Sequence, residues 1–295
     1  MRSTDWIERG EIRLHCKSRG LGDTLLLTTV AKEIKKAHPH VRVVVDSSWP
    51  QLFHNNRDVD ASFPTGNEPH PAAVIVDYHE PWPPAERKHV LEILCEQIGL
   101  QSPTIATYYH PTPSERAKAR LIRPPSTRPL LVVHPFSGFF AARSKQWDFR
   151  HWKRFLESIP PEIETIRFGE VEDPATPTER PNHRELIGTD LRLSAAILQS
   201  ADAFVGQESG LAHLATALGV PSVVLFTGFV PPDVFGYEEN VNLMPDLPYA
   251  PCWNKDGCPP CNAEICTRAI QPETVLEKTL EVLEASLSRS RNRLW

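Results

Sequence analysis

Short runs of β-branched and aliphatic residues alternate with stretches whose apolar residues recur every three to four positions. The runs predict buried strands at residues 11–16, 41–45, 72–76, 130–134 and 163–168. The stretches with helical spacing predict helices at residues 23–37, 85–98, 148–158 and 193–198, and a last one that starts at Pro272. Strands and helices that alternate in this way predict an α/β fold with parallel sheets.

Residues 203–228, AFVGQESGLAHLATALGVPSVVLFTG, predict a strand, a polar turn, a helix and a second strand in close succession. Ser209 is placed to cap this helix and Gly219 to end it. The free N–H groups of a helix at the carboxyl end of a parallel strand form an anion site, which commonly takes a nucleotide diphosphate. His213 lies one turn into the helix, within reach of such a ligand. The alternative is an ordinary strand–helix–strand unit in which His213 is a hydrogen-bonded helix residue.

The segment GQESGLAHLATALGVP resembles the signature of glycosyltransferase family 9, the heptosyltransferase family. The resemblance implies that this helix start holds a nucleotide sugar. The donor-binding residues that it implies are Gly206, Glu208, Ser209, Gly210, Leu211 and His213. Family members usually have Asp-Thr where this chain has Glu208 and Ser209. The charge and the hydroxyl are kept, and the carboxylate lies one methylene further out.

A glycine-containing loop follows the first predicted strand. Gly20 and Gly22 suggest a dinucleotide-binding loop, but Leu25 occupies the position of the third glycine, which argues against nicotinamide binding. The run from Gly22 to Leu26, GDTLL, is instead similar to the first loop of family 9, whose aspartate is the proposed general base. The resemblance therefore implies that Asp23 takes the proton of the acceptor hydroxyl. The alternative is that Asp23 only caps the helix.

Polar and aromatic residues follow two further predicted strands, at 46–49 and 77–79, and Trp82 comes shortly after. Because binding sites of α/β proteins form at the carboxyl ends of strands, we expect the acceptor there. The alternative for Trp49 and Trp82 is packing alone.

Lys145, Gln146 and Trp147 follow the strand predicted at 130–134, as a Lys-x-Trp does in the second domain of family 9. The resemblance implies that Lys145 contacts the donor phosphates, with Arg143 as a helper. The alternative is a solvated loop lysine. An acidic residue after the strand predicted at 163–168 is expected to bind the donor ribose, and the spacing does not choose between Glu170 and Glu172.

The chain has 295 residues, enough for two domains, and its composition changes to Arg, Lys, Ser, Thr and Pro between Pro111 and Pro129. We therefore expect an acceptor-binding domain at residues 1–125. A nucleotide-sugar domain at residues 126–295 would include a cysteine-rich loop and a closing C-terminal helix. The resemblance implies GT-B architecture, with two Rossmann-like domains facing a cleft.

The formal net charge is −5 and the basic residues are scattered, which argues against nucleic acid as a partner. Residues 1–10 carry charges where a signal peptide would be apolar, and no apolar run approaches the roughly 18 residues of a membrane span. These features predict a soluble, cytoplasmic protein without a transmembrane segment, and leave peripheral contact with a membrane open.

Four cysteines follow one another at short spacing near the C-terminus, and they are Cys252, Cys258, Cys261 and Cys266. Four thiolates in so short a loop can close a tetrahedral site for structural zinc or iron, and free or pairing thiols are the alternative. Four protein ligands leave no open position, so no catalytic metal is expected.

The combined prediction is an inverting glycosyltransferase that moves a sugar from a nucleotide-diphosphate donor to an acceptor hydroxyl. The resemblance implies ADP-heptose as donor and lipopolysaccharide biosynthesis as context, while the acceptor could be a glycan, a lipid-linked molecule or a protein. Two alternatives stay open: a nucleotide-sugar epimerase, and a non-catalytic protein that binds nucleotide sugars or carbohydrates on the same fold.

Overall fold

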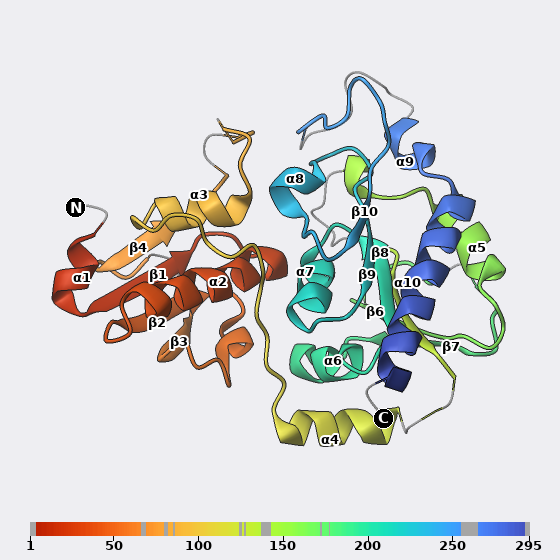
Figure 1. Ribbon diagram of the computed structural model, residues 1–295, viewed down its shortest axis with the longest axis horizontal. Coiled ribbons are helices and arrows are strands. Elements are labelled where there is room, and N and C mark those ends of the chain that lie inside the picture. The colour runs from red at the N-terminus through yellow and green to blue at the C-terminus, as the bar shows by residue number, and fades with distance from the viewer. Residues whose placement is uncertain are drawn as a thin grey trace. The chain divides into compact units, whose positions relative to one another are not determined.

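Two separate parallel sheets organise the chain (Figure 1). The computed structural model describes residues 4–65, 69–79, 82–84, 86–123, 126, 128–136, 143–171, 173–176, 178–254 and 265–292. The chain divides into two units, Met1–Thr112 and Pro113–Trp295, and each of them is α/β.

The first unit contains a sheet with the strand order β3-β2-β1-β4. Its strands are β1 (Glu11–Cys16), β2 (Arg42–Ser47), β3 (Ala61–Pro64) and β4 (Ala73–Val76). Its helices are α1 (Asp5–Arg9), α2 (Leu21–Ala37), the 3-10 helix η1 (Pro50–Phe53) and α3 (Val90–Glu96). Helix α2 packs on β1 and β2, and its predicted inner face of Leu26, Val30 and Ile34 is buried.

The second unit contains a sheet with the strand order β10-β9-β8-β5-β6-β7. Its strands are β5 (Leu130–His134), β6 (Glu164–Gly169), β7 (His183–Ile187), β8 (Ala203–Gln207), β9 (Ser222–Leu225) and β10 (Val241–Leu243). Its helices are α4 (Pro113–Ile122), the 3-10 helix η2 (Arg143–Lys145), α5 (Phe149–Ser158), α6 (Leu191–Leu198), α7 (Gly210–Ala217), α8 (Pro232–Phe235), α9 (Ile265–Ala269) and α10 (Pro272–Asn292).

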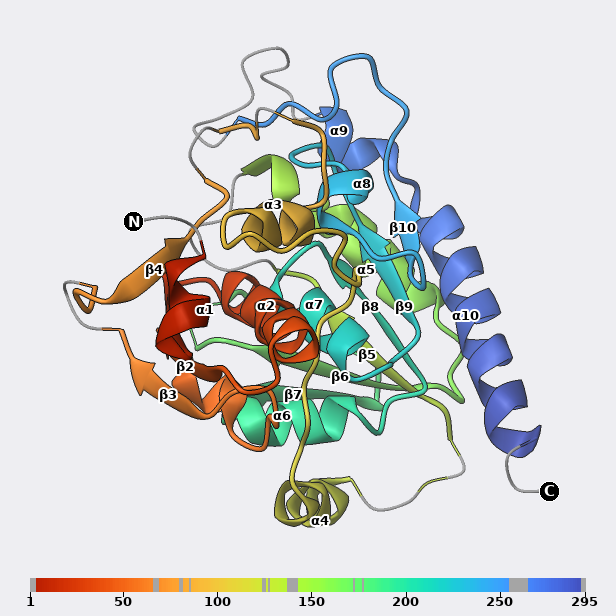
Figure 2. The same cartoon turned by 60° about the vertical axis from the view of Figure 1, so that its left-hand side comes forward.

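Helices cover both faces of this second sheet. Figures 1 and 2 show α6 and α7 on one side of the strands and α5 and α10 on the other. Under α5 and α10, alternate residues of β5, β8 and β9 form one apolar cluster with Trp152, Phe155, Val275 and Leu283. The C-terminal helix α10 is therefore part of the core of the second unit.

In each sheet the order in which strands are added switches from one side of the first strand of the unit to the other. From β1 it moves outward through β2 to β3 and then returns to place β4 on the other side of β1. From β5 it moves outward through β6 to β7 and then places β8 on the other side of β5. The carboxyl ends of β1 and β4, and those of β5 and β8, therefore flank the two switch points, where α/β sheets bind ligands.

The division between the units falls earlier than the expected position near residue 125, because α4 packs with the second unit. Glu115 of α4 pairs with Arg192 of α6, at 2.9 Å between Oε2 and Nη2. Ala119 is buried, and the carbonyl of Ile122 accepts a hydrogen bond from Arg184. The exposed Lys118 and Arg120 of this helix supply part of the polar composition that suggested a linker.

Candidate functional site

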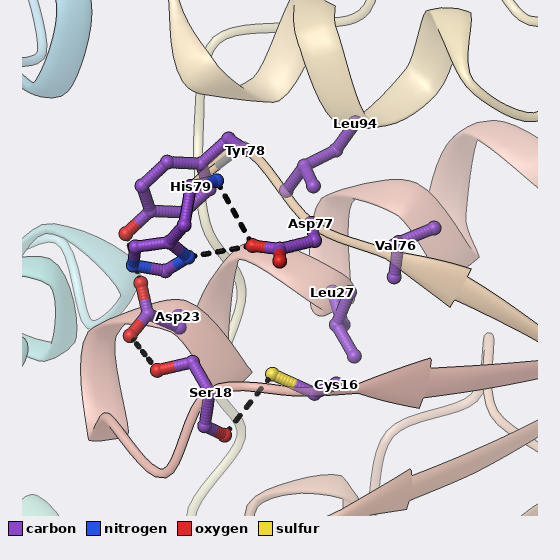
Figure 3. Close-up of a pocket in the computed structure, with 9 residues that line it drawn as sticks. All are labelled: Cys16, Ser18, Asp23, Leu27, Val76, Asp77, Tyr78, His79 and Leu94. Atoms are coloured by element: carbon purple, nitrogen blue, oxygen red, sulfur yellow. Dashed lines mark hydrogen bonds and ion pairs between the residues drawn. The ribbon is translucent and has the colours of Figure 1, made fainter. Parts of the chain in front are cut away.

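The switch point of the first unit holds a pocket at the carboxyl ends of β1 and β4 (Figure 3). Its lining residues are Cys16, Ser18, Asp23, Leu27, Val76, Asp77, Tyr78, His79 and Leu94. About 220 Å³ of empty space lies within it, including solvent at its open mouth. Burial raises the pKa of the Cys16 thiol to about 12, so this thiol is neutral and unsuited to act as a nucleophile.

Asp23 lies in this pocket, in the first turn of α2, and two hydroxyl groups hold its carboxylate. Ser18 donates to Oδ2 and Tyr78 donates to Oδ1. Gly20, and not Asp23, occupies the N-cap position of α2. The carboxylate is therefore directed into the pocket by its hydrogen bonds, which differs from the simple capping role that was the alternative.

Gly20 makes room for this arrangement. A Cβ atom at this position would collide with Oδ2 of Asp23 and lie 3.3 Å from Oγ of Ser18. The N–H group of Gly20 donates to the same Ser18 hydroxyl at 3.0 Å. The absence of a side chain at Gly20 therefore leaves the space that the Asp23 carboxylate occupies.

Asp77 and His79 form a second polar pair in the pocket. Oδ1 of Asp77 lies 2.6 Å from Nδ1 of His79 and accepts the His79 backbone N–H at 2.9 Å. Burial by itself raises the pKa of Asp77, but these hydrogen bonds and the positive charge of Lys17 outweigh it and hold that pKa below its usual value. The imidazole stacks on the Tyr78 ring at 4.2 Å between centroids, and Trp82 lies beyond it at 6.2 Å.

The other strand end that was expected near the acceptor, residues 46–49, is held by contacts with β1 and the loop after it. Asp46 accepts two hydrogen bonds from the guanidinium of Arg13, at 2.7 and 2.8 Å, and is buried. The indole of Trp49 donates to the carbonyl of Arg19 at 2.9 Å. These contacts hold the loop after β2 against the strand and loop of β1.

The switch point of the second unit brings three predicted donor-binding residues into contact. Nζ of Lys145 lies 2.5 Å from Oε2 of Glu208, and Nε2 of His213 lies 3.7 Å from Oε1 of the same carboxylate. Nδ1 of His213 lies 2.6 Å from the hydroxyl of Tyr237, which the sequence analysis did not single out. Glu208 and His213 are both buried, and the Lys145 side chain is 20% exposed.

The Glu208 carboxylate keeps its charge in this setting. Burial raises its pKa, but the positive charge of Lys145 and the interactions with His213 outweigh burial and lower it to about 2. The buried ion pair with Lys145 is thus the main electrostatic feature of the site.

Helix α7 begins directly after this carboxylate. Ser209 occupies the N-cap position, but its side chain makes no capping hydrogen bond, and its buried hydroxyl has no partner among the described residues. The N–H groups of Gly210 and Leu211 are in the first turn, where the helix itself offers no acceptor. Gly206 is needed for close packing, since a Cβ there would lie 2.6 Å from Cζ of Phe204.

Glu170, Glu172 and Arg143 were also predicted to lie near the donor. Glu170 is exposed just beyond the carboxyl end of β6, where its backbone N–H donates to Asp173, and Glu172 lies outside the described residues. The side chain of Arg143 is also outside the described part of the chain. The ribose-binding carboxylate stays a prediction.

Two of the four cysteines, Cys258 and Cys261, lie outside the described residues. Cys266 is buried, and Sγ of Cys252 lies 3.8 Å from Oγ of Ser144. Within the described ranges, no group of three or more His, Cys, Asp or Glu side chains is placed to hold a metal ion. The metal site of four cysteines therefore stays a prediction.

In the part of the chain that the structure describes, none of the helices combines the length and the apolarity that a bilayer crossing requires.

The sequence matches the family model of glycosyltransferase family 9 (heptosyltransferase) over residues 72–258. Among curated protein sequences, none matches the chain.

Several solved structures have a similar fold. ADP-heptose lps heptosyltransferase II of E. coli has a TM-score of 0.70 at 17% identity, over 93% of this chain and 99% of that one. A family 9 glycosyltransferase of Veillonella parvula has a TM-score of 0.72 at 14% identity, over 96% and 99%. TibC of enterotoxigenic E. coli, an iron-containing dodecameric glycosyltransferase, has a TM-score of 0.68 at 17% identity, over 94% and 76%. The likeness shows the predicted fold, which is α/β with the two Rossmann-like units of the GT-B class.

Proposed function

The chain belongs to glycosyltransferase family 9, the heptosyltransferase family, and is a glycosyltransferase; from this premise we propose that it transfers a heptose from ADP-heptose to an acceptor hydroxyl. Two similar structures support this donor: one is of an ADP-heptose lps heptosyltransferase, and the other is of TibC in complex with ADP-D-beta-D-heptose. The first of them also supports lipopolysaccharide as the acceptor class.

The contact of Lys145 with Glu208 at the start of α7 is the observation that carries the proposal. When the glycosidic bond of the donor breaks, the bonding electrons leave with the diphosphate, and positive groups must meet the growing charge. Lys145 supplies one such charge, and the first-turn N–H groups of α7 supply hydrogen bonds and the positive end of the helix dipole. Glu208 holds the lysine in place and offers an acceptor for hydroxyl groups of the donor.

Asp23 is the proposed general base. Its carboxylate is oriented by Ser18 and Tyr78, and it lies in a pocket that could admit the acceptor hydroxyl. Asp23 would take the hydroxyl proton as the acceptor oxygen attacks the anomeric carbon. A single displacement of this kind inverts the configuration at that carbon.

Donor binding tests the phosphate site. Calorimetric titration of the full chain with ADP-heptose, and then with UDP- and GDP-sugars, should show binding of the ADP-sugar, and Lys145→Ala should lose it. Lys153→Ala is the matched control, since Lys153 is an exposed lysine of the same unit that pairs only loosely with Glu157, at 3.8 Å. If no nucleotide sugar binds to the wild-type protein, the proposed donor site is wrong.

Turnover tests the base. Asp23→Asn should bind ADP-heptose like the wild type and release ADP about 10²- to 10⁴-fold more slowly in the presence of acceptor, which is the usual contribution of a general base. An unchanged rate would assign the proton transfer to another group.

A further inference from the structure

Lys145 belongs to a short segment, residues 144–148, that is tied to the chain on both sides of the cysteine loop. We call residues 250–254 and 265–270 the cysteine flanks, because they border residues 255–264 and contain Cys252 and Cys266. The role proposed above for Lys145 does not explain why these flanks converge on its segment.

Ser144 precedes Lys145 and is held from two directions. The hydroxyl of Thr227 donates to the carbonyl of Ser144, and Sγ of Cys252 lies 3.8 Å from its Oγ. Ser144 and Thr227 are only 1% and 2% exposed. The backbone just before the lysine is therefore anchored in the interior.

The residues that follow Lys145 are anchored by the second flank. Trp147 donates from Nε1 to the carbonyl of Ile270 at 3.0 Å. The backbone N–H of Asp148 donates to the carbonyl of Thr267 at 3.1 Å, and the Asp148 carboxylate accepts from Nε of Arg268 at 2.7 Å. Lys145 thus lies between two fixed points.

Gly228 joins both flanks to the same place. Its carbonyl accepts the N–H of Cys252 at 2.8 Å, and a Cβ on Gly228 would lie only 2.7 Å from Cβ of Cys266. Its φ of +140° is one that other residues rarely adopt. The next residue, Phe229, accepts the N–H of Trp253 at 3.0 Å, and its ring centroid lies 5.6 Å from Nζ of Lys145.

We propose that the cysteine flanks, with Thr227 and Gly228, position Lys145 for the donor diphosphate. This inference rests on the function proposed above, in which Lys145 binds that group. Binding a ligand with a loop lysine costs conformational entropy in both the loop backbone and the side chain, and a backbone that is already held removes the backbone part of this cost. The contacts thus connect Cys252, Cys266 and their neighbours to the segment of the lysine that is proposed to bind the donor.

Titration of the full chain with ADP tests the proposal. Thr227→Val removes the hydroxyl that binds Ser144 at nearly constant volume, and we expect ADP to bind about threefold to tenfold more weakly, as for one lost hydrogen bond. Thr227→Ser keeps the hydroxyl and should restore wild-type affinity. Thr279→Val is the matched control, because Thr279 is equally buried in the same unit and its hydroxyl donates to a carbonyl of its own helix, that of Val275.

Arg268→Gln provides a second test with little risk to folding, since this side chain is 58% exposed. It removes the charge that holds Asp148, and ADP should bind about twofold to threefold more weakly. Wild-type affinity in both Thr227→Val and Arg268→Gln, with binding lost in Lys145→Ala, would overturn the positioning role and leave the proposed function intact. If Thr227→Val does not fold, the result for Arg268→Gln decides. Absence of ADP binding in the wild type would instead overturn the proposed function, and this inference with it.

Discussion

Two carboxylates, Asp23 and Glu208, have opposite surroundings, and these suit different tasks. Asp23 accepts hydrogen bonds from two hydroxyl groups at a pocket, where a substrate hydroxyl could reach it. Glu208 is buried against a lysine and a histidine, so its charge serves to hold these two side chains. The first setting suits proton transfer, and the second suits the organisation of a binding site.

The low pKa of Glu208 predicts a contribution to stability that depends on pH. Its pKa is lower in the folded than in the unfolded chain, so the stabilisation is complete above the unfolded value of 4.5 and is lost as the pH falls toward about 2. The full effect is on the order of 3 kcal/mol. Glu208→Gln should therefore unfold more easily than the wild type at pH 7, and the difference should narrow between pH 4.5 and pH 2.

Urea unfolding of both proteins at several pH values measures this difference. A constant difference in free energy of unfolding from pH 7 to pH 2.5 would show that the carboxylate charge does not contribute.

At the scale of elements, the connection from β1 to α2 shows how a loop can place one carboxylate. Gly20 lies at the N-cap of α2 with an extended backbone, φ −68° and ψ 138°, which any residue can adopt. Space, and not conformational freedom, therefore requires glycine here, because a Cβ would meet the carboxylate of Asp23.

Gly20→Ala should consequently impair turnover more than folding. The methyl group would push the Asp23 carboxylate away from Ser18, and a displacement of this size at a reacting group typically lowers the rate by about 10²-fold. The melting temperature should fall by only a few degrees, about as for a loss near 1 kcal/mol. Measured ADP release and thermal unfolding check the two effects, and a rate equal to that of the wild type would show that the carboxylate is not fixed by this loop.

At the scale of the whole molecule, helix α4 decides where the chain divides. The pair between Glu115 and Arg192 lies at the contact of α4 and α6, with side chains 19% and 9% exposed. Removing one member of a buried ion pair is costly, because the other charge loses its compensation.

A fragment of residues 113–295 should therefore be more stable than a fragment of residues 126–295, by about 3 kcal/mol. Urea unfolding of the two fragments measures the difference. Glu115→Gln in the longer fragment isolates the ion pair from the rest of α4 and should reproduce a large part of the loss. Equal stability of the two fragments would show that α4 does not stabilise the second unit, and the boundary between the units would then lie near residue 125.

Local signals account for what could be predicted of the fold. The main strands β1, β5, β6 and β8 follow their short apolar runs, which are buried along most of their length, and helices α2, α5 and α7 follow the helical spacing of their apolar residues. The strands β3 and β7 are short edge strands with partly exposed residues, so no alternation marks them. Helix α3 begins at Val90, later than expected, because His89 and Glu92 form a capping box there and histidine is not a usual cap.

The sequence by itself determined the α/β class, the family and the positions of Asp23, Lys145 and the loop from Gly206 to Gly210, because periodicity and motifs are local properties. Only the tertiary structure decided their partners. Tyr78 meets Asp23 across 55 positions, and Glu115 meets Arg192 across 77. Glu208, which follows β8, pairs with Lys145, which follows β5. Such contacts depend on strand order and on the switch points of the two sheets, which bring together segments that no local pattern connects.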